Sequence, residues 1–317
     1  MKVLLLVDLE GASLLDDTRA MIPEFPEQYA VAREEITRDT NAAIRGLRRG
    51  GAREIVVVDG HGARAWPDRF NLIPEELEAG VELRRGAAVL EEKASTLDAV
   101  AMVGMHCRNG TPVGFLGHTT SGFTAVKFNG EWFGEVEMLA AVAGHSMVPT
   151  ILVTGDDATV REAKYYMPWV EGVVVKKATG RASCTCLPGE VTRALIEQAA
   201  ERALRNLSRM QPLVVPPPVV VEVFFPSARH ADLAACIPRA VRSSETSLMY
   251  VADQFLEARR FFNTALRLAS ALGTEATLRF LTADEATKAR LSEYNRQQRV
   301  SFWNAEPWIV VDLPPEA

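Results

Sequence analysis

Short apolar runs alternate with amphipathic stretches over the first 180 residues of this 317-residue chain. The apolar runs lie within residues Val3–Val7, Glu54–Asp59, Ala99–His106 and Thr150–Asp156. Continuous apolar strands separated by helical segments are typical of parallel sheets that helices cover on both faces. We therefore predict an α/β fold with a mostly parallel sheet and flanking helices.

The segments between these strands carry helix and hairpin signals. Apolar residues recur at helical spacing from residue 26 to residue 49, and Gly50-Gly51 follows them, which predicts a crossover helix. Asn129-Gly130 separates two short apolar stretches and predicts a β-hairpin. Further helices are expected at residues 135–144 and 189–210.

Prolines after residue 211 indicate a stiff linker, formed by Pro212 and Pro216–Pro218. We expect an α/β metal-binding catalytic domain at 1–211 and a smaller α+β C-terminal domain at 219–273. Residues 274–317 form a C-terminal extension. Its apolar side chains, which include Trp303 and Trp308, predict docking on the body or on a neighbouring subunit.

Carboxylates and histidines follow three of the predicted strands. Asp8 and Glu10 follow the first strand, Asp59 and His61 the second, and His106 ends the third. Because the carboxyl ends of parallel strands meet at one edge of a sheet, these side chains should converge. Carboxylate and imidazole ligands suit zinc best, with manganese or cobalt as alternatives, and the set could hold two ions that share a carboxylate.

For two further candidate residues, the neighbouring sequence is less specific for a metal or catalytic role. His118 lies in a glycine-rich loop at 107–122, where it is suited to acid/base chemistry or to stabilising an oxyanion. Glu135 begins a predicted helix, and its position alone is explained by the helix dipole.

Composition narrows the class of protein. The formal charge of -6 and the pI near 5.6 argue against a nucleic-acid binder, so a small molecule or peptide is the expected ligand. No apolar run approaches the roughly 20 residues that span a membrane, and the N-terminal run is too short for a signal peptide, so we expect a cytoplasmic protein. The four cysteines do not form a disulfide framework, and Cys184-Thr185-Cys186 lacks the second pair of a zinc site.

Several motifs, taken in their order along the chain, resemble the DppA-type D-aminopeptidases. They are Val7–Gly11, Asp59–His61, Gly104–His106, His118, Phe133–Glu135 and Gly155–Asp157. The similarity runs from residue 1 to about residue 270 and includes Val175-Lys176 and Arg181.

The resemblance implies a zinc-dependent aminopeptidase that hydrolyses the N-terminal amide bond of short peptides, D-aminoacyl peptides in particular. The family's metal ligands map onto Asp8, Glu10, His61, His106 and Glu135, and its catalytic histidine maps onto His118. It also implies a homo-oligomer, specifically a homodecamer enclosing a chamber. We expect two zinc ions per subunit, bridged by Asp8, and attack on the carbonyl by metal-bound hydroxide.

Two other functions remain open at this point. Carboxylate and histidine clusters also serve binuclear metal hydrolases that act on other amides or on phosphoesters. A metal-containing peptide-binding protein without catalytic activity is the other alternative.

Overall fold

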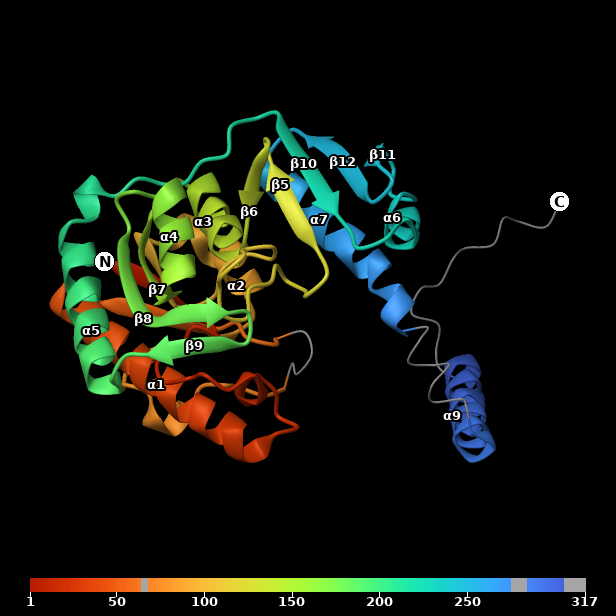
Figure 1. The fold of residues 1–317 in the computed structure, drawn as a ribbon, viewed down its shortest axis with the longest axis horizontal. Helices are drawn as coiled ribbons and strands as arrows, with labels where there is room; N and C mark the ends of the chain where they lie inside the picture. The colour runs from red at the N-terminus through yellow and green to blue at the C-terminus, as the bar shows by residue number, and fades with distance from the viewer. Residues whose placement is uncertain (64–67, 275–283, 305–317) are drawn as a thin grey trace, which may run out of the picture. The chain divides into compact units, whose positions relative to one another are not determined.

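The computed structural model describes residues 1–63, 68–274 and 284–304. The chain divides into one compact unit at Met1–Leu266 and a second at Arg267–Ala317. The first unit contains a seven-stranded sheet and a five-stranded sheet (Figure 1). All the residues of the candidate site belong to this first unit.

The larger sheet has the strand order β3-β2-β1-β4-β7-β8-β9. Its strands are β1 (Lys2–Val7), β2 (Glu54–Asp59), β3 (Glu82–Arg85), β4 (Ala99–Met105), β7 (Thr150–Asp156), β8 (Glu171–Gly180) and β9 (Ser183–Cys186). Every neighbouring pair is parallel except β8 and β9. The predicted apolar strands β1, β2, β4 and β7 lie in the interior of this sheet, which confirms the α/β fold class.

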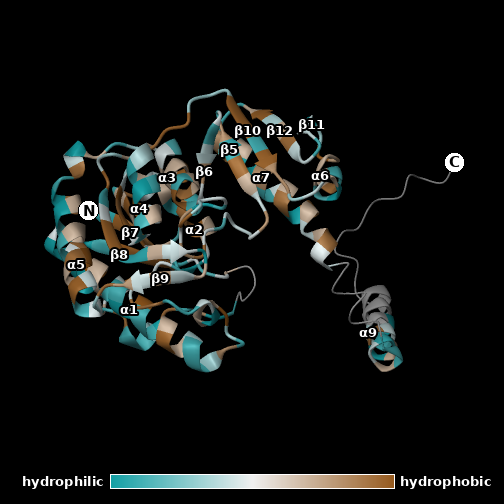
Figure 2. Ribbon diagram, in the orientation of Figure 1, coloured by the Kyte–Doolittle hydropathy of each residue, from teal (hydrophilic) through white to brown (hydrophobic). Residues whose placement is uncertain are grey.

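Helices cover both faces of the larger sheet. They are α1 (Pro26–Arg49), α2 (Ala88–Lys93), α3 (Glu135–His145), α4 (Asp157–Tyr166) and α5 (Gly189–Arg205). Helices α1 and α5 pack against each other on one face, and α3 and α4 contact the sheet from the other (Figure 1). Figure 2 shows apolar strands between these helices, whose outward surfaces are largely polar.

Helix α1 packs on the sheet through buried apolar residues, and its sequence sets both of its ends. Ile36, Ile44 and Leu47 are fully or almost fully buried against apolar residues of the sheet. Pro26 occupies the first helical turn, where its missing N–H costs no hydrogen bond. The helix ends at Arg49, as the sequence predicts, and the chain then enters β2.

The smaller sheet is antiparallel, with the order β11-β12-β10-β5-β6. Its strands are β5 (Ala125–Phe128), β6 (Glu131–Phe133), β10 (Val219–Phe224), β11 (Val241–Ser244) and β12 (Ser247–Ala252), and α6 (Ala228–Ala234) and α7 (Phe255–Ala269) follow β10 and β12. The predicted hairpin is present, with positive φ angles of 49° at Asn129 and 86° at Gly130. Strands from both sides of the proline linker thus share this sheet, and the domain boundaries at 211 and 219 stay a prediction.

Some elements have no counterpart among the predicted ones. They are β3, β8, β9, β11 and α2. Four of them, β3, β9, β11 and α2, are short, and polar residues interrupt the apolar run of β8. In the second unit, α9 (Glu285–Asn304) is described, whereas Trp308 lies outside the described residues. The docking of the extension at 274–317 also stays a prediction.

The backbones that follow β1 and end β4 approach each other closely. A Cβ atom on Gly104 would lie 2.2 Å from the Asp8 carbonyl oxygen, and one on Gly11 would lie 1.9 Å from that of Met105. Gly104 also has a φ of +74°, which side chains with a Cβ rarely adopt. These two glycines allow the segments that carry Asp8 and His106 to lie side by side.

We expect Gly104→Ala to lower the free energy of unfolding by about 3 to 5 kcal/mol, because the methyl group would push the two backbones apart. Gly130→Ala is the matched control, since Gly130 also has a positive φ but no atom would meet its Cβ within 4 Å. It should cost only about 1 kcal/mol. Denaturant midpoints of the three proteins measure the difference, and equal losses in both variants would contradict the close-approach explanation.

Candidate metal centre

Asp8 and Glu10 leave the end of β1 and both reach His61 in the loop after β2. The Nδ1 atom of His61 lies 3.3 Å from Asp8 Oδ1 and 3.1 Å from Glu10 Oε2. Strand β1 ends at Val7, and Glu10 lies in a turn rather than in an extension of the strand. The turn is closed by a hydrogen bond from the Ala12 N–H to the Leu9 carbonyl oxygen. The two carboxylates converge through this turn rather than through strand alternation.

His106 at the end of β4 faces the same carboxylates from the other side. Its Nε2 atom lies 3.5 Å from Asp8 Oδ2 and 3.4 Å from Glu135 Oε1. His118 stacks on it, with ring centroids 3.8 Å apart. The His118 Nε2 atom lies 3.6 Å from Glu135 Oε1 and 3.9 Å from Glu10 Oε1. The structure therefore brings together all six residues singled out in the sequence, and their individual roles stay predictions.

Each of the three histidines is oriented by a backbone carbonyl. The ring-to-carbonyl distances are 2.8 Å from His61 Nε2 to Met21, 2.9 Å from His106 Nδ1 to Cys107 and 2.8 Å from His118 Nδ1 to Leu116. A ring nitrogen that donates to a carbonyl leaves the other nitrogen available as a ligand or base in the neutral imidazole. In all three rings, this other nitrogen is the one that faces the carboxylates.

The donor set fits a divalent metal. Two groups of donor atoms, Asp8–Glu10–His61 and Asp8–His106–Glu135, each lie within 4.8 Å of one another, as does a third group of Glu10, His106 and His118. The Nε2 atom of His106 is buried and has no hydrogen-bond partner within the described residues. Oxygen and imidazole nitrogen ligands of this kind suit zinc. Asp8 belongs to two of the groups, one oxygen facing His61 and the other His106.

Without a metal, protons on His61 and His106 balance the buried negative charge. Burial alone would lower the pKa of His106, but the nearby carboxylates of Glu135, Glu10 and Asp8 raise it to about 10. Burial alone would raise the pKa of Glu135, but His106 and His118 outweigh it and bring that pKa to about 2. The imidazolium of His106 therefore occupies the electrostatic position of a cation.

In Asp8, Glu10 and His61, burial and the attraction of opposite charges also act against each other. Burial and the charge of Glu10 raise the pKa of Asp8 to about 6, although His61 and His106 oppose this change. Burial is also the largest effect on Glu10 and His61, yet their mutual attraction prevails. The attraction between the Glu10 carboxylate and the His61 ring holds the pKa of Glu10 well below 4.5 and the pKa of His61 well above 6.5.

A buried lysine supports the turn that carries Glu10. The Lys176 Nζ atom, on β8, donates to the carbonyl oxygens of Glu10 at 2.9 Å and Leu15 at 2.6 Å. Burial lowers the pKa of this ammonium group. Sequence reasoning assigned no role to Lys176, although a lysine directly after Val173–Val175 in an apolar stretch was a usable signal.

Asp59 holds the His61 loop through other residues. Its carboxylate accepts hydrogen bonds from Asn71 Nδ2 at 2.6 Å and from Arg85 Nη1 at 2.5 Å. Asn71 and Arg85 each also donate to the His61 carbonyl oxygen, both at 2.8 Å. Asp59 is fully buried. It therefore positions the backbone of His61 through two neighbours.

Glu135 is placed by the start of α3. The helix begins at the residue after Gly134, whose N–H donates to Glu137 Oε2 at 2.7 Å. The Thr120 N–H donates to Glu135 Oε1 at 2.7 Å. Because Thr120 belongs to the His118 loop, this bond ties that loop to the helix. The dipole explanation for Glu135 is thus incomplete, because its carboxylate faces His106 and His118.

Asp156 anchors the loop that carries His118. It caps α4 by accepting from the Thr159 N–H at 2.7 Å. Its other oxygen accepts from the Phe115 N–H at 2.7 Å. The next residue, Leu116, donates its N–H to the Arg181 carbonyl oxygen. These bonds fix the loop on the N-terminal side of His118.

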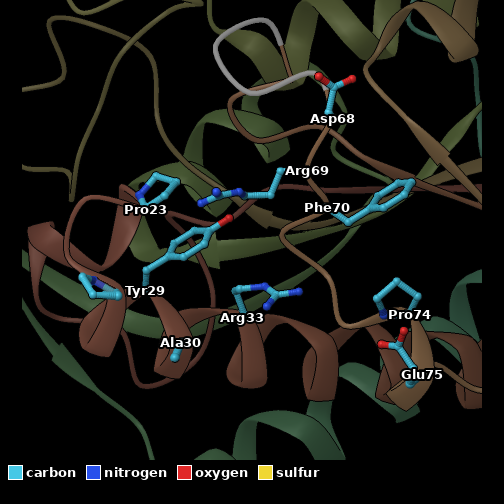
Figure 3. A pocket seen from close by; sticks show the side chains of 10 residues that line it. Pro23, Tyr29, Ala30, Arg33, Asp68, Arg69, Phe70, Pro74 and Glu75 are labelled. Atoms are coloured by element: carbon cyan, nitrogen blue, oxygen red, sulfur yellow. The ribbon is translucent and has the colours of Figure 1, made fainter.

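A cavity of about 450 Å³ lies beside the His61 loop. Figure 3 shows Tyr29 and Arg33 on α1 at one wall, with Arg69 and Phe70 on the other. The Tyr29 hydroxyl donates to Asn71 Oδ1 at 2.7 Å. Through Tyr29, the cavity wall is therefore hydrogen-bonded to Asn71, which donates to the His61 carbonyl oxygen. None of the six site residues lines the cavity.

Comparison with known proteins places the chain in a family. Residues 1–264 match the model of the M55 peptidases, described as D-aminopeptidase. The chain belongs to the D-aminopeptidase family. A D-aminopeptidase of Bacillus subtilis (strain 168) is 30% identical over 266 residues, covering 81% of this chain and 94% of that protein. This family membership confirms the expected class, an aminopeptidase.

The fold is also similar to that of a solved D-aminopeptidase, described as the zinc-dependent D-aminopeptidase DppA from Bacillus subtilis, a self-compartmentalizing protease. The TM-score is 0.78 at 27% identity, and the match covers 85% of this chain and 98% of that one. Among the described residues, no helix is both long and apolar enough to cross a membrane.

Zinc binding to the metal-free protein should release protons at pH 7. The pKa of His106 lies at about 10, above its ordinary 6.5, so the residue is protonated there and must lose its proton to become a ligand. The same imidazolium stabilises the metal-free fold below pH 6.5, and this contribution is lost as the pH rises through about 10.

Calorimetry in buffers of different ionisation enthalpy counts the protons released. His106→Ala should lower the count by about one. His145→Ala should leave it unchanged, because His145 is exposed at the end of α3. Zinc binding to the unaltered protein without proton release at pH 7 would contradict the assignment.

Proposed function

We propose that this protein is a zinc-dependent aminopeptidase that removes the N-terminal residue from short D-aminoacyl peptides. The observation that carries the proposal is the convergence of three carboxylates on three histidines, each of which is oriented by a backbone carbonyl. Membership of the D-aminopeptidase family and likeness to a zinc-dependent member support the same reaction.

Two zinc ions per subunit are the expected complement. Asp8, Glu10 and His61 would hold one ion, and Asp8, His106 and Glu135 the other. When bound, zinc acts as a Lewis acid that polarises the scissile carbonyl and acidifies water.

His118 is the proposed acid/base residue. Its Nδ1–H donates to the Leu116 carbonyl oxygen, so Nε2 carries the lone pair that faces the site. A proton taken up at Nε2 as water attacks the peptide carbonyl would pass to the leaving amine nitrogen. Its side chain is about a quarter exposed, against 1% for His106. That exposure suits a residue that meets substrate.

The assembly we propose is a homo-oligomer, by analogy with the relative described as self-compartmentalizing. A homodecamer is the specific expectation from the family resemblance. In such an assembly, the site would open into an enclosed space that admits short peptides.

Histidine variants separate ligands from the acid/base residue. His61→Ala and His106→Ala should lose at least one zinc ion and the activity, because each removes a ligand. His118→Ala should keep both ions and lose about 10²- to 10⁴-fold in kcat, the usual contribution of acid/base catalysis. Zinc content by elemental analysis and kcat on one substrate measure both effects, with His145→Ala as the control for an exposed histidine. Loss of zinc from His118→Ala would identify that residue as a ligand instead.

Substrate handedness tests the remaining part of the proposal. The zinc-loaded protein should hydrolyse D-aminoacyl p-nitroanilides faster than their L counterparts, and it should not turn over an aryl phosphate. A preference for the L series would overturn the D-specificity, and phosphate turnover would favour a phosphoesterase. Peptide binding without turnover of any substrate would favour the binding-protein alternative.

A further inference from the structure

Two cysteines lie together on β9, an edge strand of the larger sheet (Figure 1). Cys184 and Cys186 are two residues apart in an extended segment, so their side chains share one face. Their Sγ atoms are 4.0 Å apart, and both thiols are free and partly exposed. Neither cysteine belongs to the carboxylate–histidine centre.

The spacing of the sulfur atoms suits a bridging cation. Two metal–thiolate bonds of about 2.3 Å can span sulfur atoms up to about 4.6 Å apart, so a cation fits the observed 4.0 Å without backbone movement. A disulfide needs an S–S distance of about 2.05 Å. Two steps along a strand separate Cα atoms by about 6.6 to 6.8 Å, at the upper limit that disulfides tolerate. The strand therefore favours chelation over oxidation.

The number of ligands identifies the class of cation. Structural zinc takes four ligands, yet neither cysteine belongs to any cluster of three or more metal-binding side chains in the part of the chain that the structure describes. Thiolates select soft cations, of which Cu(I) accepts two-coordinate sites. A pair of thiols without further ligands thus suits Cu(I) better than zinc.

A positive charge lies close to the pair. Cys184 Sγ contacts the Leu15 carbonyl oxygen at 3.5 Å, and the Lys176 ammonium donates to the same oxygen at 2.6 Å. A hydrogen bond from the Cys184 thiol lowers the pKa of Cys186 to about 7, against burial and the charge of Asp16, whereas the same bond and burial raise the pKa of Cys184. The ammonium would offset the single negative charge of a complex between two thiolates and Cu(I).

We propose that Cys184 and Cys186 form a binding site for one Cu(I) ion. The ion displaces one proton from each thiol and forms two Cu–S bonds. Copper stays in the monovalent state throughout, so no electron is transferred and no oxidant is needed. This inference does not rest on the proposed peptidase activity.

The test is an anaerobic titration of the reduced, zinc-loaded full-length protein with Cu(I) in competition with a coloured Cu(I) chelator. The unaltered protein should retain one Cu(I) per chain. Cys184→Ser and Cys186→Ser should each lose it at the same chelator concentration. Cys236→Ser is the matched control, since Cys236 is an exposed thiol, and it should bind as the unaltered protein does. Retention of Cu(I) in both β9 variants would overturn the proposal.

A second measurement needs no variant. Phenylarsine oxide bridges closely paired thiols, so prior treatment of the unaltered protein should abolish uptake of Cu(I). Undiminished uptake after this treatment would overturn the proposal. All four cysteines should be recovered as thiols once the copper is removed. The loss of two thiols would instead identify the pair as a redox disulfide and would equally contradict the Cu(I) site.

Discussion

Burial of like charges is the constraint on which the rest of the site depends. Asp8 and Glu10 are 9% and 5% exposed, and Glu135 lies close enough to His106 to share a proton or a metal with it. Carboxylates removed from water at such short range repel one another unless positive charge lies between them. His61 and His106 supply that charge as protons, and their orientation leaves the same nitrogens available to a cation. The arrangement is stable only while this positive charge is present.

The scaffold meets this constraint with contacts to the main chain of the charged residues and their neighbours. Gly104 and Gly11 allow the segments after β1 and at the end of β4 to lie together, and Lys176 donates a hydrogen bond to the Glu10 carbonyl oxygen. Asp59 fixes the loop of His61 through Asn71 and Arg85. Each supporting residue acts on main-chain atoms. The ligand side chains are therefore positioned by the backbone, which suits a site that requires fixed distances.

Whether a site residue could be predicted from the sequence depended on how far along the chain the residues that position it lie. Asp8, His61 and His106 were predictable because strand ends in a parallel sheet converge, a rule that needs only local apolar patterns. Glu135 was assigned through the family resemblance, because its position depends on a hairpin and a helix cap with no metal signature. The support from Lys176 to Glu10 joins residues far apart in sequence, and no local pattern encodes it. Strands β8 and β9 escaped prediction for the related reason that polar residues interrupt their apolar pattern.

The smaller sheet has a consequence for the order in which the site forms. Glu135 directly follows the β5–β6 hairpin, and β5 pairs along its open side with β10, which ends at Phe224. Asn129 in the hairpin also bonds to Pro216 and Val220. During synthesis, most of the larger sheet can assemble before β10 exists, whereas the hairpin that precedes Glu135 still has an unpaired edge. The hairpin that precedes Glu135 thus gains its partner strand only after β10 has left the ribosome, later than any of the ligand residues.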